Sequence, residues 1–292
     1  MKKLILCISV MVAVCGCDQS QKLPQKPSIE GIKFTDLIPS TAEKLPAAIR
    51  LKMLTFELPR ENLLQMSLAF KALSKENIKF VNRKAFDRNA FVAGIGSQEI
   101  WSLTGDKLKA AKAKKISTNN ITIRNRDGDE IPVKEVFDNV SLIYTDASSQ
   151  VIQHDLFSGT VSWRIKAGPA AQRKGAAIIK IEALSRSQKP SILSKATGNE
   201  EFGLTVFRSL SMMLKMEEGQ FLILAPQAAL AKVKTETPAT INLAELFFFS
   251  RGDFYTRKPV TGSEKPDNGQ YDFQKDIVLA RIYMLICTEV QN

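Results

Sequence analysis

The first half of the chain alternates between short apolar runs and segments whose apolar residues recur at a helical period. This pattern predicts, in order, a strand over 51–58, a helix over 63–73, strands over 78–81 and 90–95, a helix over 100–111 and a strand over 116–123. No element is assigned to residues 82–89. The order β-α-β-β-α-β fits a compact split βαβ module with two helices on one face of a small sheet.

Beyond Arg124 the pattern predicts strands with a single short helix near 243–247. The strands are expected over 140–144, 159–165, 176–184, 202–216, 220–225 and 276–290. Residues 126–129 favour a hairpin turn, because Gly128 tolerates positive φ. Two polar segments, 185–199 and 261–270, are interpreted as surface loops. The expected fold class is α+β, in which the small split βαβ module precedes a mostly antiparallel β-sandwich or open barrel.

The N-terminus has the parts of a secretory signal. Met1, Lys2 and Lys3 precede an apolar run from Leu4 to Val14 that only Ser9 interrupts. This run is too short for a bilayer, whose hydrocarbon core needs about 20 apolar residues. We therefore interpret residues 1–16 as a signal peptide that is removed and the mature chain as an exported protein.

The last residues of this segment, Val14-Cys15-Gly16-Cys17, resemble a bacterial lipobox. The resemblance implies cleavage after Gly16 and acylation of Cys17, so that the mature protein is held on an envelope membrane by its lipid. The alternative is an ordinary signal peptide cut near Gly16, which leaves Cys17 as a free thiol. Asp18 resembles the inner-membrane retention signal of enteric lipoproteins and favours that membrane, while the choice between inner and outer membrane stays open.

Removal of residues 1–16 also removes Lys2 and Lys3 and lowers the formal charge from +11 to +9. Residues 17–46, rich in Gln, Ser, Pro and Lys, are interpreted as a flexible stalk. The remaining chain is divided into an α+β module over 47–124 and a β-rich domain over 125–292. Cys287 is then the only cysteine without a lipid, which leaves no intrachain disulfide, and its apolar surroundings predict a buried, inert thiol.

The composition offers little for catalysis. His154 is the only histidine, so a zinc site and a histidine-based triad are not expected, and no metal or cofactor is predicted. His154 lies in a polar stretch interpreted as a loop between strands. Gly94-Ile95-Gly96-Ser97 favours a strand-to-helix turn with Ser97 as N-cap over a dinucleotide loop, since Glu99 would repel a phosphate.

Five lysines gather near the end of the second predicted helix: Lys107, Lys109, Lys112, Lys114 and Lys115. Their functional interpretation is contact with anionic lipid headgroups or cell-wall polymer, and the alternative is a solvated helix face. Nucleic acid is not expected as a partner, because the chain is exported and its basic residues lack interleaved aromatics. Phe247-Phe248-Phe249 is expected to be buried.

Three segments of the second half resemble the late part of the secretin family: Phe207–Met216, Glu218–Pro226 and Leu243–Phe248. Ala244 stands where that family has glycine. The βαββαβ order upstream is similar to the ring-building modules that precede this part in secretins. The resemblance implies subunits that assemble into envelope rings.

Two classes of function follow. The first is a non-enzymatic binding, scaffold or assembly protein of the envelope that meets a partner protein through edge strands of its β-rich part, with a secretin-like ring-building or accessory subunit as an alternative. The second is an envelope hydrolase with a carboxylate site, for which Glu200-Glu201 and Glu217-Glu218 are the candidates.

Overall fold

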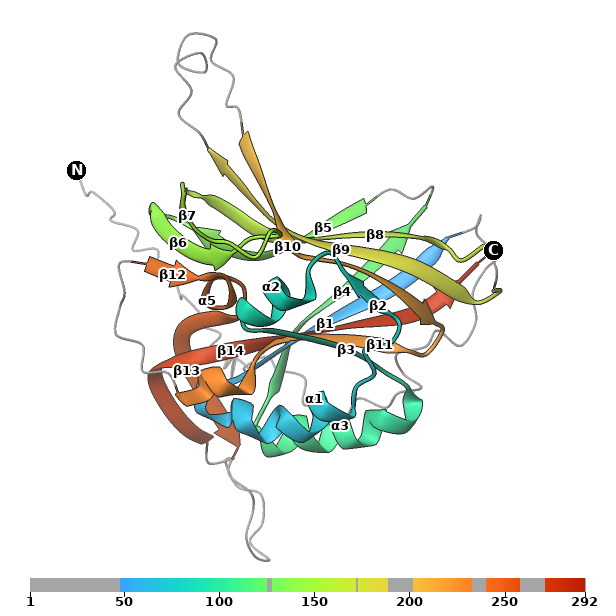
Figure 1. Ribbon diagram of the computed structural model, residues 1–292. Coiled ribbons are helices and arrows are strands. Elements are labelled where there is room, and N and C mark those ends of the chain that lie inside the picture. The colour runs from blue at the N-terminus through green and yellow to red at the C-terminus, as the bar shows by residue number, and fades with distance from the viewer. Residues whose placement is uncertain are drawn as a thin grey trace, which may run out of the picture.

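The computed structural model describes residues 48–124, 128–171, 173–188, 202–232, 240–257 and 271–291. These residues form antiparallel sheets with short helices, which confirms the α+β class (Figure 1). The predicted signal peptide over 1–16 and the predicted stalk over 17–46 lie outside the described residues, as do residues 189–199 and 261–270 of the two predicted loops. The first four residues of the predicted loop over 185–199 belong to a strand instead.

The predicted elements occur in the predicted order, and the structure adds elements at positions where the sequence predicted none, among them Arg83–Arg88, Val151–Leu156, Ala228–Lys232, Thr240–Asn242 and Phe249–Arg257. The strands are β1 (Ile49–Pro59), β2 (Ile78–Phe80), β3 (Phe91–Gly96), β4 (Lys114–Ile123), β5 (Gly128–Val136), β6 (Val140–Thr145), β7 (Val151–Leu156), β8 (Gly159–Pro169), β9 (Ala176–Gln188), β10 (Phe202–Glu217), β11 (Phe221–Pro226), β12 (Thr240–Asn242), β13 (Phe249–Arg257) and β14 (Tyr271–Val290). The helices are η3 (Arg60–Met66), α1 (Ser67–Ala72), α2 (Arg83–Arg88), α3 (Gln98–Ala110), η4 (Ala228–Lys232) and α5 (Leu243–Phe248), of which η3 and η4 are 3-10 helices.

The largest sheet, here called sheet A, draws its strands from both halves of the chain. Its order is β3-β11-β14-β1-β4, and β13 pairs with part of β14. The long strand β14 pairs with β1 from Ile49 opposite Val290 to Pro59 opposite Leu279. The later strands β11 and β14 therefore lie between β3 on one side and β1 with β4 on the other, so segments from before and after residue 124 share one sheet. The division of the chain into two domains at 124/125 stays a prediction.

Two further sheets complete the β structure. Sheet B has the order β2-β10-β9-β8-β5, and sheet C has the order β12-β6-β7. The pair β12–β6 is parallel, while the other pairs of described strands are antiparallel. Figure 1 shows sheet B on one side of sheet A and the helices α1 and α3 on the other. Sheet A is thus the central layer, which explains why β11 and most of β1 and β14 are buried.

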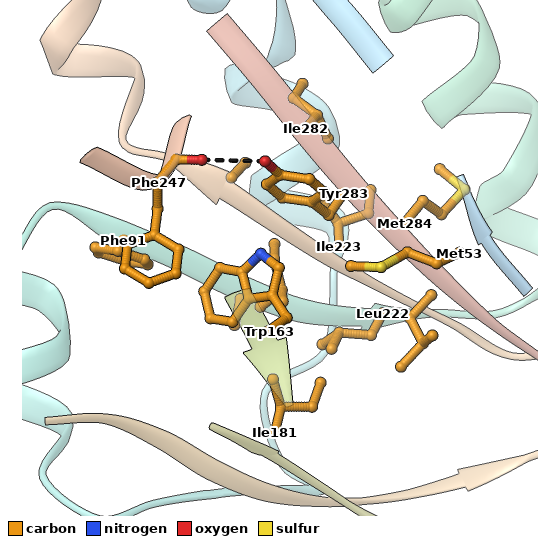
Figure 2. Close-up of a cluster of buried hydrophobic side chains, with 14 of the residues drawn as sticks. Met53, Phe91, Trp163, Ile181, Leu222, Ile223, Phe247, Ile282, Tyr283 and Met284 are labelled. Atoms are coloured by element: carbon orange, nitrogen blue, oxygen red, sulfur yellow. Dashed lines mark hydrogen bonds between the residues drawn. The ribbon is translucent and has the colours of Figure 1, made fainter. Parts of the chain in front are cut away.

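Aromatic side chains fill the space between the layers (Figure 2). The Trp163 ring lies 4.8 Å from the Phe247 ring and 6.1 Å from the Tyr283 ring, and Phe91 contacts both Trp163 and Phe248. The Tyr283 hydroxyl donates a hydrogen bond of 3.1 Å to the Phe247 carbonyl. The prediction that Phe247-Phe248-Phe249 is buried is confirmed: α5 turns Phe247 and Phe248 into this cluster, and Phe249 is buried at the start of β13.

The segment 82–89, to which the sequence assigned no element, contains the helix α2. Asn82 caps it, since its side-chain oxygen accepts a hydrogen bond of 3.0 Å from the Ala85 amide. Ala85 and Phe86 are the buried residues of this single-turn helix. Two apolar residues are too few to produce a helical period, which is why the hydrophobic pattern missed it.

The prediction of a hairpin at 126–129 is wrong, because the strands before and after these residues do not pair with each other. Residues 125–127 lie outside the described part, and Gly128 and Asp129 begin β5. Instead, β4 pairs with β1 in sheet A and β5 pairs with β8 in sheet B. The chain therefore passes from sheet A to sheet B between Arg124 and Gly128.

The buried thiol of Cys287 is confirmed. Its side chain lies in β14 within the core, and burial raises the pKa of the thiol to about 12. A thiolate is the reactive form of cysteine, so this group is inert in the folded protein at neutral pH. Ser97 occupies the N-cap position of α3 as expected, although its side chain makes no capping hydrogen bond.

Candidate functional site

The open edge of sheet A is formed by β4. This strand pairs with β1 from Ile123 opposite Ile49 to Lys114 opposite Glu57, and within the described part of the chain no strand pairs with its other side. An unpaired strand edge presents backbone N–H and C=O groups that another strand can use.

A bulge limits the usable length of this edge. Thr55 lies opposite Ser117 and Phe56 lies opposite Lys115, so Ile116 is an extra residue on β4. Bulges and lysines are the devices by which proteins protect strand edges from unwanted pairing. Lys114, Lys115 and the bulged Ile116 together protect the first part of β4. The regular edge that remains is Ser117–Ile123, which we call the β4 edge.

Side chains alternate along the β4 edge. Ile121 and Ile123 are buried in the core, whereas Thr118, Asn120 and Thr122 are exposed. This alternation fixes the register of the strand, because a slip of one residue would expose the isoleucines. The edge is therefore rigidly held, and its solvent side is polar.

Three other strand edges, those of β3, β5 and β2, are either covered by the protein itself or short. On β3, the Ile95 amide donates to the Ser74 carbonyl at 2.8 Å, and the Ser74 amide donates back to Ile95 at 2.9 Å. On β5, the Val133 carbonyl accepts a hydrogen bond of 2.9 Å from Arg281. Strand β2 has only three residues. The β4 edge is longer and carries no such cover from described residues.

The sequence placed the binding edge in the β-rich domain over 125–292, but the β4 edge belongs to the earlier region. The hydrophobic pattern showed a strand at 116–123 without showing which strands would flank it. The signal was present in the polar run Ser117-Thr118-Asn119-Asn120, which is more typical of an exposed edge than of a central strand.

The five lysines that the sequence suggested for contact with an anionic surface extend from the end of α3 to the start of β4. Lys107 and Lys109 lie in the last turn of α3, where cations favour the negative end of the helix dipole. Lys112 follows directly, and Lys114 places its ammonium group 4.3 Å from the centre of the Phe254 ring. Lys109 and Lys112 are exposed, and the other three are partly buried. Their contact with an anionic surface stays a prediction.

Other candidate residues have structural contacts or lie outside the described chain. His154 is part of β7 and lies opposite Leu142, so its assignment to a loop was wrong. The central residues of β7, Gln153–Asp155, are all polar, which hid its strand period. Glu217 forms an ion pair of 2.8 Å with Arg173, and Glu218 accepts a hydrogen bond of 2.7 Å from the Val290 amide. Gly16, Cys17, Glu200 and Glu201 are not among the described residues.

The described residues contain neither a cluster of metal ligands nor a membrane-spanning helix. No group of three histidine, cysteine or acidic side chains is placed to hold a metal ion there. In the same residues, no helix has the length and apolar character required to cross a membrane.

Sheet B carries an ion cluster on one face. Arg186 donates to both carboxylate oxygens of Glu130, at 2.7 and 2.8 Å, and Arg164 donates to Oε1 of Glu130 at 2.8 Å. The hydrogen bonds from Arg186, with those from Arg164, lower the pKa of Glu130 from 4.5 to about 2 despite some desolvation. The cluster ties β5 to β8 and β9.

This shift predicts a defined pH dependence. The lowered pKa means that the Glu130 contribution to stability is complete above about pH 4.5 and is lost as the pH falls toward 2. Because the cluster is partly exposed, we expect Glu130→Gln to lower the free energy of unfolding by about 1 kcal/mol at pH 7. Urea unfolding at pH 7 and pH 2 should show that most of this difference disappears at the lower pH. The matched control is Glu135→Gln on the same strand, and an equal loss in both variants would contradict the prediction.

Comparison with known proteins gives a weak structural resemblance to secretin domains. No family model matches the sequence, and no curated protein matches it significantly. The InvG secretin domain β-barrel of the Salmonella SPI-1 injectisome is 11% identical, with a TM-score of 0.25 over 84% of this chain and 64% of that chain. The ETEC pilotin–secretin complex AspS–GspD is 11% identical, with a TM-score of 0.23 over 85% of this chain and 50% of that chain. This chain thus spans less than two thirds of the length of these solved chains.

Proposed function

We propose that this chain is a lipid-anchored protein of the bacterial envelope that binds a partner protein by strand addition at the β4 edge. The observation that carries the proposal is the regular, solvent-facing edge over Ser117–Ile123, which described strands leave unpaired on one side. The lipobox-like Val14–Cys17 supports the anchor. The role is binding, scaffolding or assembly, without a catalytic step.

Strand addition fits the chemistry of this edge. A partner strand gains affinity from main-chain hydrogen bonds, and alternate side chains provide the specificity. Over seven residues an added strand makes roughly six or seven such bonds, each with a net contribution of about 0.5–1.5 kcal/mol. Thr118, Asn120 and Thr122 would be its neighbours on the solvent face, so a partner strand with Thr, Ser or Asn at alternate positions is favoured.

Amide hydrogen exchange tests the proposal. We expect the outward-facing amides of Ser117–Ile123 to exchange quickly in the purified protein. In a complex isolated from native membranes in mild detergent, the same amides should exchange at least about tenfold more slowly. Strand β9 is the matched control, because it already pairs with β8 and β10 and should not change.

Two other outcomes of the exchange experiment would change the proposal. Unchanged exchange over Ser117–Ile123 in a complex that contains a partner would contradict strand addition at this edge. Protection that increases with the concentration of the purified protein would identify the added strand as a second copy of this chain. That result would favour the ring-building subunit over a separate partner protein.

A further inference from the structure

The outer face of the helix layer exposes three leucines. Leu64 of η3 is 43% exposed, Leu68 of α1 is 56% exposed and Leu103 of α3 is 37% exposed. Other apolar residues of these helices, such as Leu63 and Phe70, are buried. The layer therefore has apolar side chains on both faces, and packing inside the protein accounts only for the inner face.

The helices that carry the leucines contact each other and run antiparallel. At one end of the pair, the Asn62 side chain of η3 donates a hydrogen bond of 3.1 Å to the carbonyl of Ala111, just after α3. At the other end, Ser74 after α1 is hydrogen-bonded to Ile95, three residues before α3 begins. Figure 1 shows α1 and α3 side by side under sheet A. Leu68 is consequently level with Leu103 along the pair.

Basic residues are frequent in the segments that carry these leucines. The helix layer and the start of β4 contain Lys71, Lys75, Lys107, Lys109, Lys112, Lys114 and Lys115. The acidic residues of the same segments are Glu61, Glu76, Glu99 and Asp106. The lysines outnumber the acidic residues, so the net positive charge of these segments favours contact with an anionic surface. Exposed leucines with flanking lysines are typical of helices that lie on a bilayer.

We infer that this face, defined by Leu64, Leu68 and Leu103 with the surrounding lysines, rests on the lipid surface that holds the acyl chains of Cys17. The inference depends on the proposed lipid anchor. Thirty residues separate Cys17 from Ala48, where the described chain begins, and such a chain can span up to about 100 Å. This reach allows either side of the body to meet the membrane. The anchor keeps the local lipid concentration high, so a weak contact becomes populated.

This orientation also agrees with the β4 edge as the site for a partner. Because β4 starts two residues after Lys112, its lysine end would lie near the headgroups. The strand then runs away from the helix layer, and Ser117–Ile123 remains accessible from the aqueous side.

Fluorescence quenching in vesicles tests the inference. The full-length, lipidated protein is labelled with an environment-sensitive fluorophore at Leu68→Cys or Leu103→Cys, and Cys287 stays unlabelled because it is buried. The vesicles contain phosphatidylethanolamine with about one third anionic phosphatidylglycerol. Brominated lipids serve as quenchers. The controls are Ile178→Cys and Met213→Cys on sheet B, whose native side chains are 42% and 45% exposed.

We expect the helix labels to be quenched at least about twofold more than the sheet B labels, and neutral phosphatidylcholine or Lys107→Gln with Lys109→Gln and Lys112→Gln to reduce the difference. Equal quenching at all four positions in protein that floats with the vesicles would overturn the inference and leave the anchor intact. Protein that does not float with the vesicles would overturn the proposed anchor, and the inference with it.

Discussion

Replacement of Trp163 by alanine is expected to lower the free energy of unfolding by about 3–5 kcal/mol. Trp163 is fully buried on β8 and contacts rings from three other elements, in β3, α5 and β14 (Figure 2). Its removal leaves a cavity between sheet A and sheet B that the paired strands cannot close. Chemical denaturation measures the loss, followed by far-UV circular dichroism because its signal comes mainly from the backbone and not from the replaced tryptophan.

Trp163→Phe is the matched control for this prediction. The indole Nε1 of Trp163 has no hydrogen-bond partner among the described residues, so phenylalanine removes volume without breaking a hydrogen bond. We expect a loss of about 1–2 kcal/mol, well below that of alanine. Equal losses in the two variants would mean that the volume of this cluster does not hold the two sheets together.

Gly159→Ala is expected to destabilise the protein by about 3 kcal/mol, at the upper end of the usual range for overpacking. A Cβ atom at Gly159 would lie 2.0 Å from the carbonyl oxygen of Arg186 and 2.7 Å from the Cα of Ser187. Both atoms belong to the backbone of β9, which pairs with β8 and β10 and cannot move aside cheaply. Thermal and urea unfolding measure the effect.

Gly105→Ala provides the contrast. Gly105 lies within α3, and a Cβ atom there would meet no atom within 4 Å. Since glycine is a poor helix former, alanine should stabilise the protein by about 0.5–1 kcal/mol. A stabilising Gly159→Ala, or a strongly destabilising Gly105→Ala, would contradict the packing described for these two positions.

Local patterns predicted most elements of this fold because each strand and helix is encoded over a short stretch. The apolar run of β11 and the periodic leucines of η3 and α1 are visible in the sequence, and the structure has them at the expected places. Elements that depend on few apolar residues were missed. Strand β7 has three consecutive polar residues at its centre, Gln153–Asp155, and α2 buries only Ala85 and Phe86.

The pairing of distant segments could not be predicted in this way. Strand β11 lies between β3 and β14, and β14 brings the C-terminus beside β1. Hydrophobic periodicity specifies which face of a strand is buried and does not specify the neighbouring strand. For the same reason the sequence could not locate the β4 edge, since an edge is defined by the strand that is missing beside it.

The exposed surface of the helix layer could be predicted only in part. The lysines from Lys107 to Lys115 are obvious in the sequence, whereas the helical period of the apolar residues does not show that some of the leucines are exposed. Leu64, Leu68 and Leu103 are exposed because η3–α1 and α3 bury other residues against sheet A. The membrane-facing surface proposed for this layer follows from the antiparallel packing of those helices.

Mass spectrometry of the mature N-terminal peptide tests the central claim, the lipid anchor, most directly. The account predicts a peptide that begins at Cys17 and carries two or three acyl chains, and it predicts that Cys17→Ser carries none. An unmodified N-terminus on a protein that fractionates away from membranes would contradict the claim.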